Sequence, residues 1–368
     1  MRNDFSTDFT RDMGTDLADH YLRWLPFIRE SILSLLADYA NPNVRARTWG
    51  IAEQGSDPAF LDDNLVAPFR SYLQRSGKML RPYLVCWCLE AYGGDPSLRP
   101  CQVALAEVIH SSSLILDDIV DDSPFRRGDQ TAHRMVGVLI AGAAGSGWLN
   151  TGFDIVWRDR DLLGERVTAR LMEELAWEHF VTGLGTTVDL TWAWKATMDH
   201  PPEEYLQQVV HRSTSYTYRL PMKIGGLVAD ASESEIAKLA AFGEQIGLAF
   251  QLIDDVLNVK PTDAHWGKEV AEDIGQGKIT LQILMALGRA SVPDRQRLID
   301  ILRARTADPA ERAVAVAILE DTGALDDCRR LAHQLYEEAS RIIEDMAVDV
   351  QAQRRLQDFA AYIVKRGR

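Results

Sequence analysis

The chain has few cysteines and no cysteine motif. Its 368 residues contain four, and none of them forms a CxxC pair or lies in a His/Cys cluster with the spacing of a zinc site. A structural zinc site and a disulfide framework are therefore excluded. The sequence predicts buried thiols in a reducing cytoplasm at Cys86, Cys88, Cys101 and Cys328.

Positive charge is also scarce. Lysine and arginine number 40 against 54 aspartates and glutamates, and the formal net charge is −14. General binding to nucleic acid or to an anionic membrane depends on a basic surface, so this balance argues against both partners. An anionic small molecule stays compatible with the sequence if positive charge or a metal ion is gathered locally.

The most apolar part of the sequence is not expected to span a bilayer. The most apolar window, residues 135–149, is short and rich in glycine, and Asp154 follows it. We expect a buried helix there, because small residues permit close packing. The first 15 residues are polar and acidic, unlike a secretory signal, and are expected to be flexible. The sequence thus predicts a cytoplasmic protein with no stable membrane insertion.

What the sequence has in abundance is helical periodicity. Residues 16–40 repeat apolar side chains every three or four positions, which predicts an amphipathic helix that Pro26 kinks or divides. Residues 41–66 are predicted to form a loop. With strand patterns nearly absent, the sequence predicts a single all-α domain, residues 1–368, of roughly ten or more helices. Further helices are expected to begin near Pro68, Leu80, Pro100, His133, Glu165, Pro202, Glu233, Ile279, Pro293, Pro309 and Ala324.

The segment DDIVD concentrates negative charge after an apolar turn. On a helix, Asp117 and Asp121 lie one above the other and Asp118 lies beside them, whereas Asp122 points elsewhere and is expected to be solvated. Like charges at this spacing repel, so a buried cluster needs a compensating ligand. Mg²⁺ binds through one or two carboxylates together with substrate phosphate oxygens. A solvated acidic helix end is the alternative, although two arginines after the cluster favour a ligand site.

A second acidic pair, Asp254 and Asp255, also follows an apolar helical run, and Asn258 comes four positions after Asp254. Two such elements on different helices could face each other across a cavity. An ordinary helix end is the alternative for the second pair taken by itself. The combination of the two pairs is much less expected by chance.

Basic side chains occur where a diphosphate would need them. Lys78 and Arg81 lie three positions apart in SGKMLRP, which suits phosphate binding because arginine offers a planar fork and lysine a point charge. Further along, Lys268, Asp273 and Lys278 share a loop with three glycines. A surface helix start and a polar hinge, respectively, are the alternatives for these two segments.

In this order, the four segments resemble the trans-prenyl diphosphate synthases, the family that includes farnesyl and geranylgeranyl diphosphate synthases. The matching motifs are GKxxRP at 77–82, DDxxDxxxxRRG at 117–128, FQxxDDxxN at 250–258 and GKxxxxDxxxGK at 267–278. The resemblance covers roughly residues 68 to 290. It implies the all-α class I isoprenoid synthase fold, a helical bundle around a deep central cavity, and a homodimer.

The resemblance implies a role for each matching side chain. Asp117, Asp118, Asp121 and Asp254 would bind the Mg²⁺ that bridges an allylic diphosphate, with Asp255 supporting the second site by its charge. Arg126, Gln251 and Lys268 would contact the allylic diphosphate or the reacting carbon. A basic C-terminal tail, Lys365, Arg366 and Arg368, would close over the second substrate. The substrate-binding residues would be Lys78, Arg81, His110, Arg126, Arg127 and Lys278, of which Lys78, Arg81, His110 and Arg127 would bind isopentenyl diphosphate.

Three segments depart from the family pattern. In 211-HRSTSYTYRLP-221, which resembles KTxxYxFxxP, Arg212 replaces the usual lysine and Ser213 the usual threonine, while Tyr216 matches. Charge and hydroxyl are retained, and the resemblance implies catalytic roles for all three. The segment GTTVD at 185–189 has no glutamine after its glycine, and Asn258 takes the place of a final aspartate.

The implied reaction is a Mg²⁺-dependent head-to-tail (1′-4) condensation of isopentenyl diphosphate with an allylic diphosphate. Product length would depend on the helix positions one and two turns before Asp117, which are Ser113, Ser112, Ile109 and Val108. Serines leave space where an aromatic residue would block elongation, so the resemblance implies a C20 product, geranylgeranyl diphosphate. Close packing of neighbouring helices is the alternative reason for these serines.

Two rival functions stay open. A class I terpene cyclase on the same fold needs no second substrate, and so has no reason to keep Lys78, Arg81 and Arg127 together. A non-catalytic subunit of a prenyl synthase would be expected to have lost aspartates of the first motif, and this chain has lost none.

Overall fold

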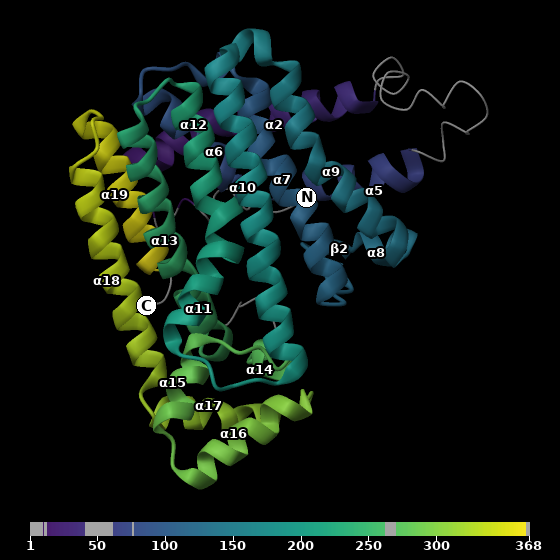
Figure 1. Cartoon of the computed structure of the whole chain (residues 1–368), viewed down its shortest axis with the longest axis vertical. Helices are drawn as coiled ribbons and strands as arrows, with labels where there is room; N and C mark the ends of the chain where they lie inside the picture. The colour runs from purple at the N-terminus through teal and green to yellow at the C-terminus, as the bar shows by residue number, and fades with distance from the viewer. Residues whose placement is uncertain (1–9, 11–12, 41–61, 76, 262–269, 366–368) are drawn as a thin grey trace. The chain divides into compact units, whose positions relative to one another are not determined.

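The computed structural model describes residues 10, 13–40, 62–75, 77–261 and 270–365. In this part of the chain nearly every element is a helix, and the two strands contain two residues each, so the prediction of an all-α protein is confirmed (Figure 1). The elements are α2 (Thr15–Ala40), η2 (Asp62–Val66), α5 (Ala67–Gln74), α6 (Leu80–Ala91), η3 (Pro96–Leu98), α7 (Pro100–Val120), β1 (Phe125–Arg126), β2 (Asp129–Gln130), α8 (Ala132–Val136), α9 (Val138–Arg158), α10 (Arg160–Lys195), α11 (Pro202–Val209), η4 (Val210–Arg219), α12 (Leu220–Val228), α13 (Glu233–Val259), α14 (Glu272–Gly275), α15 (Leu281–Arg289), α16 (Val292–Ala304), α17 (Pro309–Asp321), α18 (Ala324–Glu344) and α19 (Val350–Lys365).

The chain forms two compact units. The first comprises Met1–Ala176 and Leu220–Ile236, and the second comprises Trp177–Arg219 and Ala237–Arg368. Helices α10 and α13 each begin in the first unit and end in the second. The sequence predicts that residues 1–368 form a single domain. The division into two compact units does not test this, so the single domain stays a prediction.

Helix α7 is the centre of the first unit. It contacts α2, α5, α6, α9 and α12, and it is buried without interruption from Gln102 to Ser112. A helix covered on all sides needs apolar or small residues all round, and the sequence QVALAEVIHSS largely supplies them. Helix α9 approaches closely because a Cβ at Gly145 would lie only 3.1 Å from the side chain of Ile115.

The second unit consists mainly of successive helices that pack against their neighbours in the sequence. Helices α18 and α19 lie side by side (Figure 1), and α15 contacts α11, α16, α17 and α18. Two of its helices, α16 and α17, have a side-chain cap and a proline in their first turn. The side chain of Ser291 accepts a hydrogen bond from the N–H of Asp294, and Asp308 accepts one from Ala310. Such caps satisfy N–H groups that have no partner within the helix.

Most predicted helix starts agree with the structure, and six agree to the residue: Leu80, Pro100, Pro202, Glu233, Pro309 and Ala324. Of the two effects expected of Pro26, a kink or a division of the first helix, division is ruled out, because α2 is continuous from Thr15 to Ala40. Pro26 is exposed, as is Leu22, whose carbonyl loses its helical partner. Water can therefore satisfy that carbonyl, and the helix continues.

The predicted loop over 41–66 is wrong at its end. Residues 62–66 form the π-helix η2, where Val66 is buried and the indole N–H of Trp148 donates to the carbonyl of Leu65 at 2.9 Å. Residues 41–61 lie outside the described residues. Most of the predicted flexible segment 1–15 lies outside them too, but Met13 is buried and α2 begins at Thr15.

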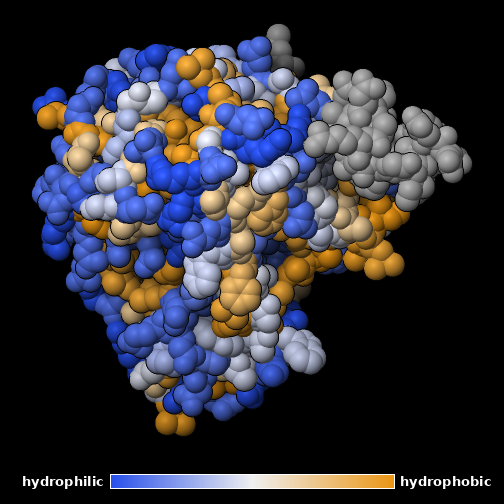
Figure 2. Space-filling model, turned by 45° about the horizontal axis from the view of Figure 1, so that its top comes forward, coloured by the Kyte–Doolittle hydropathy of each residue, from blue (hydrophilic) through white to orange (hydrophobic). Residues whose placement is uncertain are grey.

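The apolar window 135–149 is only partly the buried helix that we expected. Gly137, with φ of 89°, separates α8 from α9, and Met135, Val138 and Leu139 are exposed. Only one side of this window packs against α7, so its apolar residues on the other side reach the surface. Figure 2 shows apolar side chains at the surface in several places on the face drawn.

Helix α13 is the one described helix that is long and apolar enough to cross a membrane. More than half of its apolar window, 56%, is buried within the protein. Buried core helices share this length and composition, so the feature is weak support for a membrane span.

Candidate active site

Helix α7 ends inside the first aspartate motif. The N–H of Asp121 donates to the carbonyl of Asp117 at 2.8 Å, so these two residues follow each other by one helical turn, and both are exposed. Asp122 has a left-handed backbone, with φ of 49°, and its carboxylate accepts a hydrogen bond from Arg134 at 2.8 Å. As predicted, Asp122 is solvated and turns away from its neighbours.

Asp118 is enclosed by protein, with a side chain that is 0% exposed. One carboxylate oxygen accepts a hydrogen bond from Arg126 Nε at 2.8 Å, and the other accepts one from the Tyr72 hydroxyl at 2.5 Å. A buried carboxylate with both oxygens engaged is a structural ion pair and not an open ligand for Mg²⁺. The assignment of Asp118 to the metal therefore does not fit the geometry, and Asp118 instead positions Arg126.

A short hairpin presents the two arginines that follow the motif. Strands β1 and β2 pair antiparallel with Arg126 opposite Asp129, which leaves a two-residue loop of Arg127 and Gly128. Both loop residues have positive φ, 53° and 83°, as in a type I′ turn. Glycine adopts this backbone readily, whereas Arg127 adopts it under strain. The turn sends Arg126 to Asp118 and Arg127 to Gly77.

Arg75 holds the hairpin in place, and it was not among the residues predicted from the sequence. Its guanidinium is buried, lies 4.4 Å from the ring centre of Tyr72, and donates to the carbonyls of Arg126 at 3.1 Å and Gln130 at 2.5 Å. No motif marks residue 75 for this contact. Only the fold brings the end of α5 to the hairpin.

The residues predicted to bind isopentenyl diphosphate gather in the first unit. A Cβ at Gly77 would lie 2.6 Å from Nη1 of Arg127, so this glycine leaves room for the guanidinium. Burial, followed by the positive charges of Arg81 and Arg127, holds the pKa of His110 well below its usual value. His110 is therefore a neutral imidazole at neutral pH. Lys78 is exposed next to this cluster in the sequence.

Glu107 belongs to the same cluster and was also not predicted. It is buried, and burial raises its pKa, although the charges of Arg81 and Arg127 oppose that rise. An acid in the apolar helical run ALAEVIH was a signal for such a buried partner, because carboxylates are rarely fully buried unless they are paired.

The residues predicted to control chain length lie on α7 and differ in their exposure. Val108, Ile109 and Ser112 are buried, whereas Ser113 is partly exposed. The hydroxyl of Ser112 donates to the carbonyl of Val108 at 2.7 Å, and that of Ser113 donates to the carbonyl of His110 at 2.8 Å. The serines thus satisfy their hydroxyls within the helix and act as small side chains. Their effect on product length stays a prediction.

The second aspartate motif lies near the end of α13, in the second unit. Asp254 is partly exposed, but Asp255 is buried and accepts hydrogen bonds from the Tyr205 hydroxyl and from Gln251 Nε2, the latter at 2.8 Å. Burial and the charge of Asp273 raise the pKa of Asp255 to about 7. Tyr205 is a further site residue that no sequence motif indicated.

Asn258 fixes the segment that follows this motif. Its backbone carbonyl accepts from the N–H of Ala271 at 2.8 Å, and its side-chain oxygen accepts from the N–H of Asp273 at 3.2 Å. Asp273 in turn pairs with Lys278 at 3.2 Å. An asparagine oxygen serves this purpose as well as an aspartate oxygen would. Of the remaining predicted residues, Lys268, Arg366 and Arg368 lie outside the described residues.

The predicted catalytic residues of 211–221 lie in η4, a π-helix. Arg212 forms an ion pair with Asp189 of α10, the acid of the GTTVD segment, for which the sequence predicted no partner. Ser213 is partly exposed. Tyr216 is buried, with its ring edge-on to His179 at 5.4 Å between centroids.

Within the described residues, no group of three or more His, Cys, Asp or Glu side chains is arranged to hold a metal ion. Mg²⁺ keeps several waters and binds through one or two carboxylates plus substrate phosphates, so a preformed cage is not required. The carboxylates of Asp117 and Asp121 in the first unit, and of Asp254 in the second, fit this donor chemistry.

Comparison with known sequences identifies the family of the chain. The sequence profile of the polyprenyl synthetase family matches residues 62–319. A short chain isoprenyl diphosphate synthase of Methanothermobacter thermautotrophicus is 33% identical over 270 residues, which is 73% of this chain and 81% of that protein.

Solved structures show the same fold. A geranylgeranyl pyrophosphate synthetase from Pyrococcus horikoshii has a TM-score of 0.79 and 27% identity, with 95% of this chain and 98% of that one covered. A geranylgeranyl pyrophosphate synthase from Corynebacterium glutamicum, complexed with isoprenyl diphosphate and magnesium, has a TM-score of 0.79 and 25% identity, with 92% and 97% covered. The chain therefore belongs to the polyprenyl synthetase family, the trans-prenyl diphosphate synthases, which are prenyltransferases with the all-α class I isoprenoid synthase fold.

Proposed function

We propose that this prenyltransferase condenses isopentenyl diphosphate with an allylic diphosphate in a Mg²⁺-dependent head-to-tail (1′-4) reaction, and that its product is geranylgeranyl diphosphate. The observation that carries the proposal is the cluster of Arg81, Arg127 and neutral His110 in the same unit as the exposed carboxylates of Asp117 and Asp121. A basic cluster and an acidic pair suit two diphosphates that are bound in different ways.

The acidic set serves the allylic substrate. Asp117 and Asp121 of the first unit and Asp254 of the second would hold Mg²⁺, which would supply positive charge to the leaving diphosphate and so favour ionisation of the C–O bond. The similar structure complexed with isoprenyl diphosphate and magnesium supports a role for Mg²⁺. Arg126, oriented by Asp118, adds a guanidinium directed at the same diphosphate.

The basic set serves isopentenyl diphosphate. Arg81 and Arg127 offer planar donor forks, and Lys78 adds a point charge two residues before α6. Because His110 is neutral, it can donate one hydrogen bond without adding a third positive charge to a buried position. Gly77 is small enough to leave the Arg127 guanidinium in place.

The remaining residues stabilise charge that develops during the reaction. The double bond of isopentenyl diphosphate attacks the allylic cation, and a proton then leaves to the released diphosphate. Proximity of the two substrates supplies much of the rate, and no protein nucleophile is needed. Gln251, Ser213 and Tyr216 direct dipoles at the passing cation. Arg212, Lys268 and Lys278 bind the leaving diphosphate.

Small side chains before the first motif favour the longer product. Ser113 and Ser112 occupy the turn before Asp117, and each donates its hydroxyl to a backbone carbonyl of α7 itself. The space that an aromatic residue would fill at these positions accepts a growing chain.

A homodimer in the cytoplasm is the expected form of the enzyme.

The test is incorporation of labelled isopentenyl diphosphate with Mg²⁺ and dimethylallyl, geranyl or farnesyl diphosphate, followed by analysis of product length. We expect a C20 product. Absence of incorporation with all three partners would refute the proposal, and release of diphosphate from an allylic substrate alone would indicate a cyclase. The variant Ser113→Phe should shorten the product while retaining incorporation, because an aromatic ring one turn before Asp117 blocks elongation.

A further inference from the structure

The segment that carries three of the proposed catalytic residues has an unusual backbone. Val210–Arg219 form a π-helix, η4, and π-helices are rare and often occur at functional sites. Arg212 and Tyr216, four positions apart, would lie one above the other on an α-helix, but they diverge in the wider π turn. The register of η4 therefore decides how Arg212, Ser213 and Tyr216 are arranged.

Close packing against glycines constrains η4. A Cβ at Gly185 of α10 would lie 2.7 Å from the backbone nitrogen of Arg212, and a Cβ at Gly247 of α13 would lie 2.7 Å from Cβ of Thr214. Contacts below 3.0 Å would force one of the elements to move. Glycine at both positions thus allows α10 and α13 to pack directly against η4.

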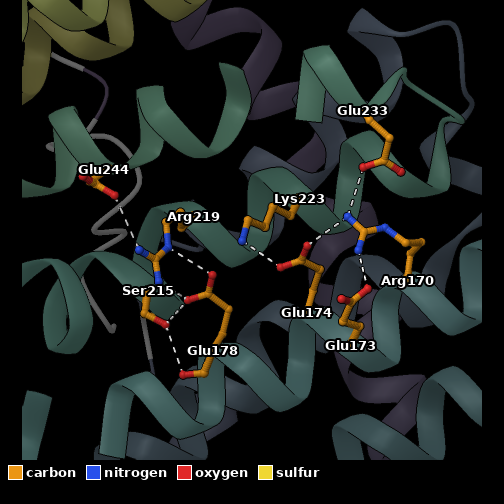
Figure 3. A network of polar contacts seen from close by, with 9 residues as sticks. All are labelled: Arg170, Glu173, Glu174, Glu178, Ser215, Arg219, Lys223, Glu233 and Glu244. Carbon is orange, nitrogen blue, oxygen red and sulfur yellow. Dashed lines mark hydrogen bonds and ion pairs between the residues drawn. The ribbon is translucent and has the colours of Figure 1, made fainter. Parts of the chain in front are cut away.

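The carboxylate of Glu178 on α10 holds η4 at two points (Figure 3). Its Oε2 accepts a hydrogen bond from Ser215 Oγ at 2.6 Å, and Arg219 donates to both oxygens, from Nε at 3.0 Å and from Nη2 at 2.6 Å. Thr182 donates to the hydroxyl of Ser215 at 2.8 Å, and Glu244 lies 3.6 Å from Arg219. The side chains of Glu178 and Arg219 are 0% and 10% exposed.

Stability alone does not explain this pair. Removing two charges from water costs so much that replacing a buried ion pair by apolar residues is often neutral or stabilising. Buried ion pairs can instead favour one conformation over its competitors. Here the competitor is an α-helical η4, in which Ser215 and Arg219 would turn differently relative to Glu178.

We propose that Glu178 is a positioning residue for prenyl transfer: its carboxylate fixes the π-helical register of η4 and thereby the placement of Arg212, Ser213 and Tyr216. This inference rests on the proposed function for the catalytic roles of those three residues. Glu178 itself need not touch a substrate.

The test compares steady-state kinetics of Glu178→Gln with those of the wild-type enzyme. Glutamine has nearly the same shape as glutamate but lacks the charge that binds Arg219, so we expect kcat to fall about 10- to 100-fold, as misplacement of catalytic groups by about 1 Å does. The KM for isopentenyl diphosphate should stay within about twofold, because its proposed ligands lie in the first unit. Glu178→Asp should restore part of kcat.

Glu174→Gln is the matched control. Glu174 lies one turn earlier on α10 and pairs with Lys223 of α12 at 2.7 Å, with both side chains about equally buried, 11% and 12% exposed (Figure 3). Neither of these two residues belongs to η4. This variant should lose stability as Glu178→Gln does but keep its kcat.

Two further measurements keep the inference testable. The double variant Glu178→Leu with Arg219→Met removes the ion pair and retains apolar packing, so it should fold and still show the low kcat. Hydrogen exchange of the amides in 210–219 should accelerate in Glu178→Gln and not in Glu174→Gln. Unchanged exchange, or a folded double variant with kcat within about twofold of wild type, would overturn the inference. An inactive wild-type enzyme would instead refute the proposed function, while hydrogen exchange would still decide the register.

Discussion

At the scale of single residues, the basic cluster of the first unit depends on one glycine. Gly77 lies against the end of the Arg127 side chain, and Arg127 comes from a strained two-residue loop. Gly77 of GKxxRP and Arg127 of RRG are therefore in contact, although they are far apart in the sequence.

We predict that Gly77→Ala raises the KM for isopentenyl diphosphate by about 10-fold or more, because the added methyl displaces the Arg127 guanidinium from its diphosphate. The displaced atoms are the far end of a flexible side chain, so the melting temperature should change little. Steady-state kinetics and thermal unfolding check both parts.

Gly147→Ala is the control for this prediction. Among the described residues, no heavy atom other than those of its chain neighbours and the adjacent backbone of α9 lies within 4 Å of a Cβ at Gly147, which is in the middle of α9. Alanine there should stabilise the protein by roughly 0.5–1 kcal/mol and leave the KM unchanged. An equal rise of KM in both variants would contradict the role given to Gly77.

Asp118 shows what motif spacing leaves undecided. The sequence places Asp117, Asp118 and Asp121 at one helix end and does not distinguish among them as Mg²⁺ ligands. Only the fold brings Tyr72 and Arg126 to the second acid and buries its carboxylate. Motif spacing determines which face of the helix each aspartate lies on. The side chains that bond to each aspartate come from other segments, and spacing within the motif does not identify them.

At the scale of elements, a polar cluster joins α2 to α6. His20 of α2 bonds to the Tyr83 hydroxyl at 2.9 Å and to the Glu90 carboxylate at 2.5 Å, and Trp24 donates to Glu90 at 2.8 Å. Burial alone would raise the pKa of Glu90, but the hydrogen bonds from His20 and Trp24 outweigh it and lower the pKa.

The direction of this shift predicts a pH dependence. A carboxyl with a lowered pKa in the folded state contributes stability that is present above its unfolded pKa and is lost as pH falls through its folded pKa. Glu90→Gln should therefore be less stable than wild type by roughly 1–2 kcal/mol at pH 7, and the difference should shrink below about pH 4.5. Urea unfolding at a series of pH values measures this difference.

Glu320→Gln serves as the control for the pH series. Glu320 pairs with Lys260 at 2.5 Å, but both side chains are exposed, and such surface pairs contribute little. A pH-dependent difference of the same size in both variants would show that the α2–α6 cluster has no special contribution.

At the scale of the whole molecule, the described residues contain no preformed three-ligand metal cluster. We therefore expect a chelator to leave the melting temperature of the ligand-free protein unchanged. Mg²⁺ together with inorganic diphosphate should raise it by a few degrees, because a ligand at about 100 times its Kd stabilises by about 2.7 kcal/mol. Thermal unfolding with each component alone and with both tests this.

Two aspartate variants make this measurement specific. Asp117→Asn should abolish the joint effect of Mg²⁺ and diphosphate, whereas Asp122→Asn should preserve it, because Asp122 turns to Arg134. Stabilisation that survives in Asp117→Asn would remove this residue from the proposed ligand set.

The sequence by itself determined the all-α class, most helix starts and the order of the motifs. These features depend on local patterns, namely apolar periodicity, capping residues and prolines at helix starts such as Pro100 and Pro309. The same local patterns mark Asp117 and Asp121 as neighbours on one helix face.

Only the tertiary structure decided which of these groups have partners. It enclosed Asp118, paired Arg212 with Asp189, continued α2 through Pro26 and wound 210–219 into a π-helix. Each outcome depends on contacts between segments remote in the sequence, and the free energies of such contacts override local propensity. Local sequence patterns therefore identified the candidate site residues. Tertiary packing decided which of these side chains are buried or paired and which are exposed.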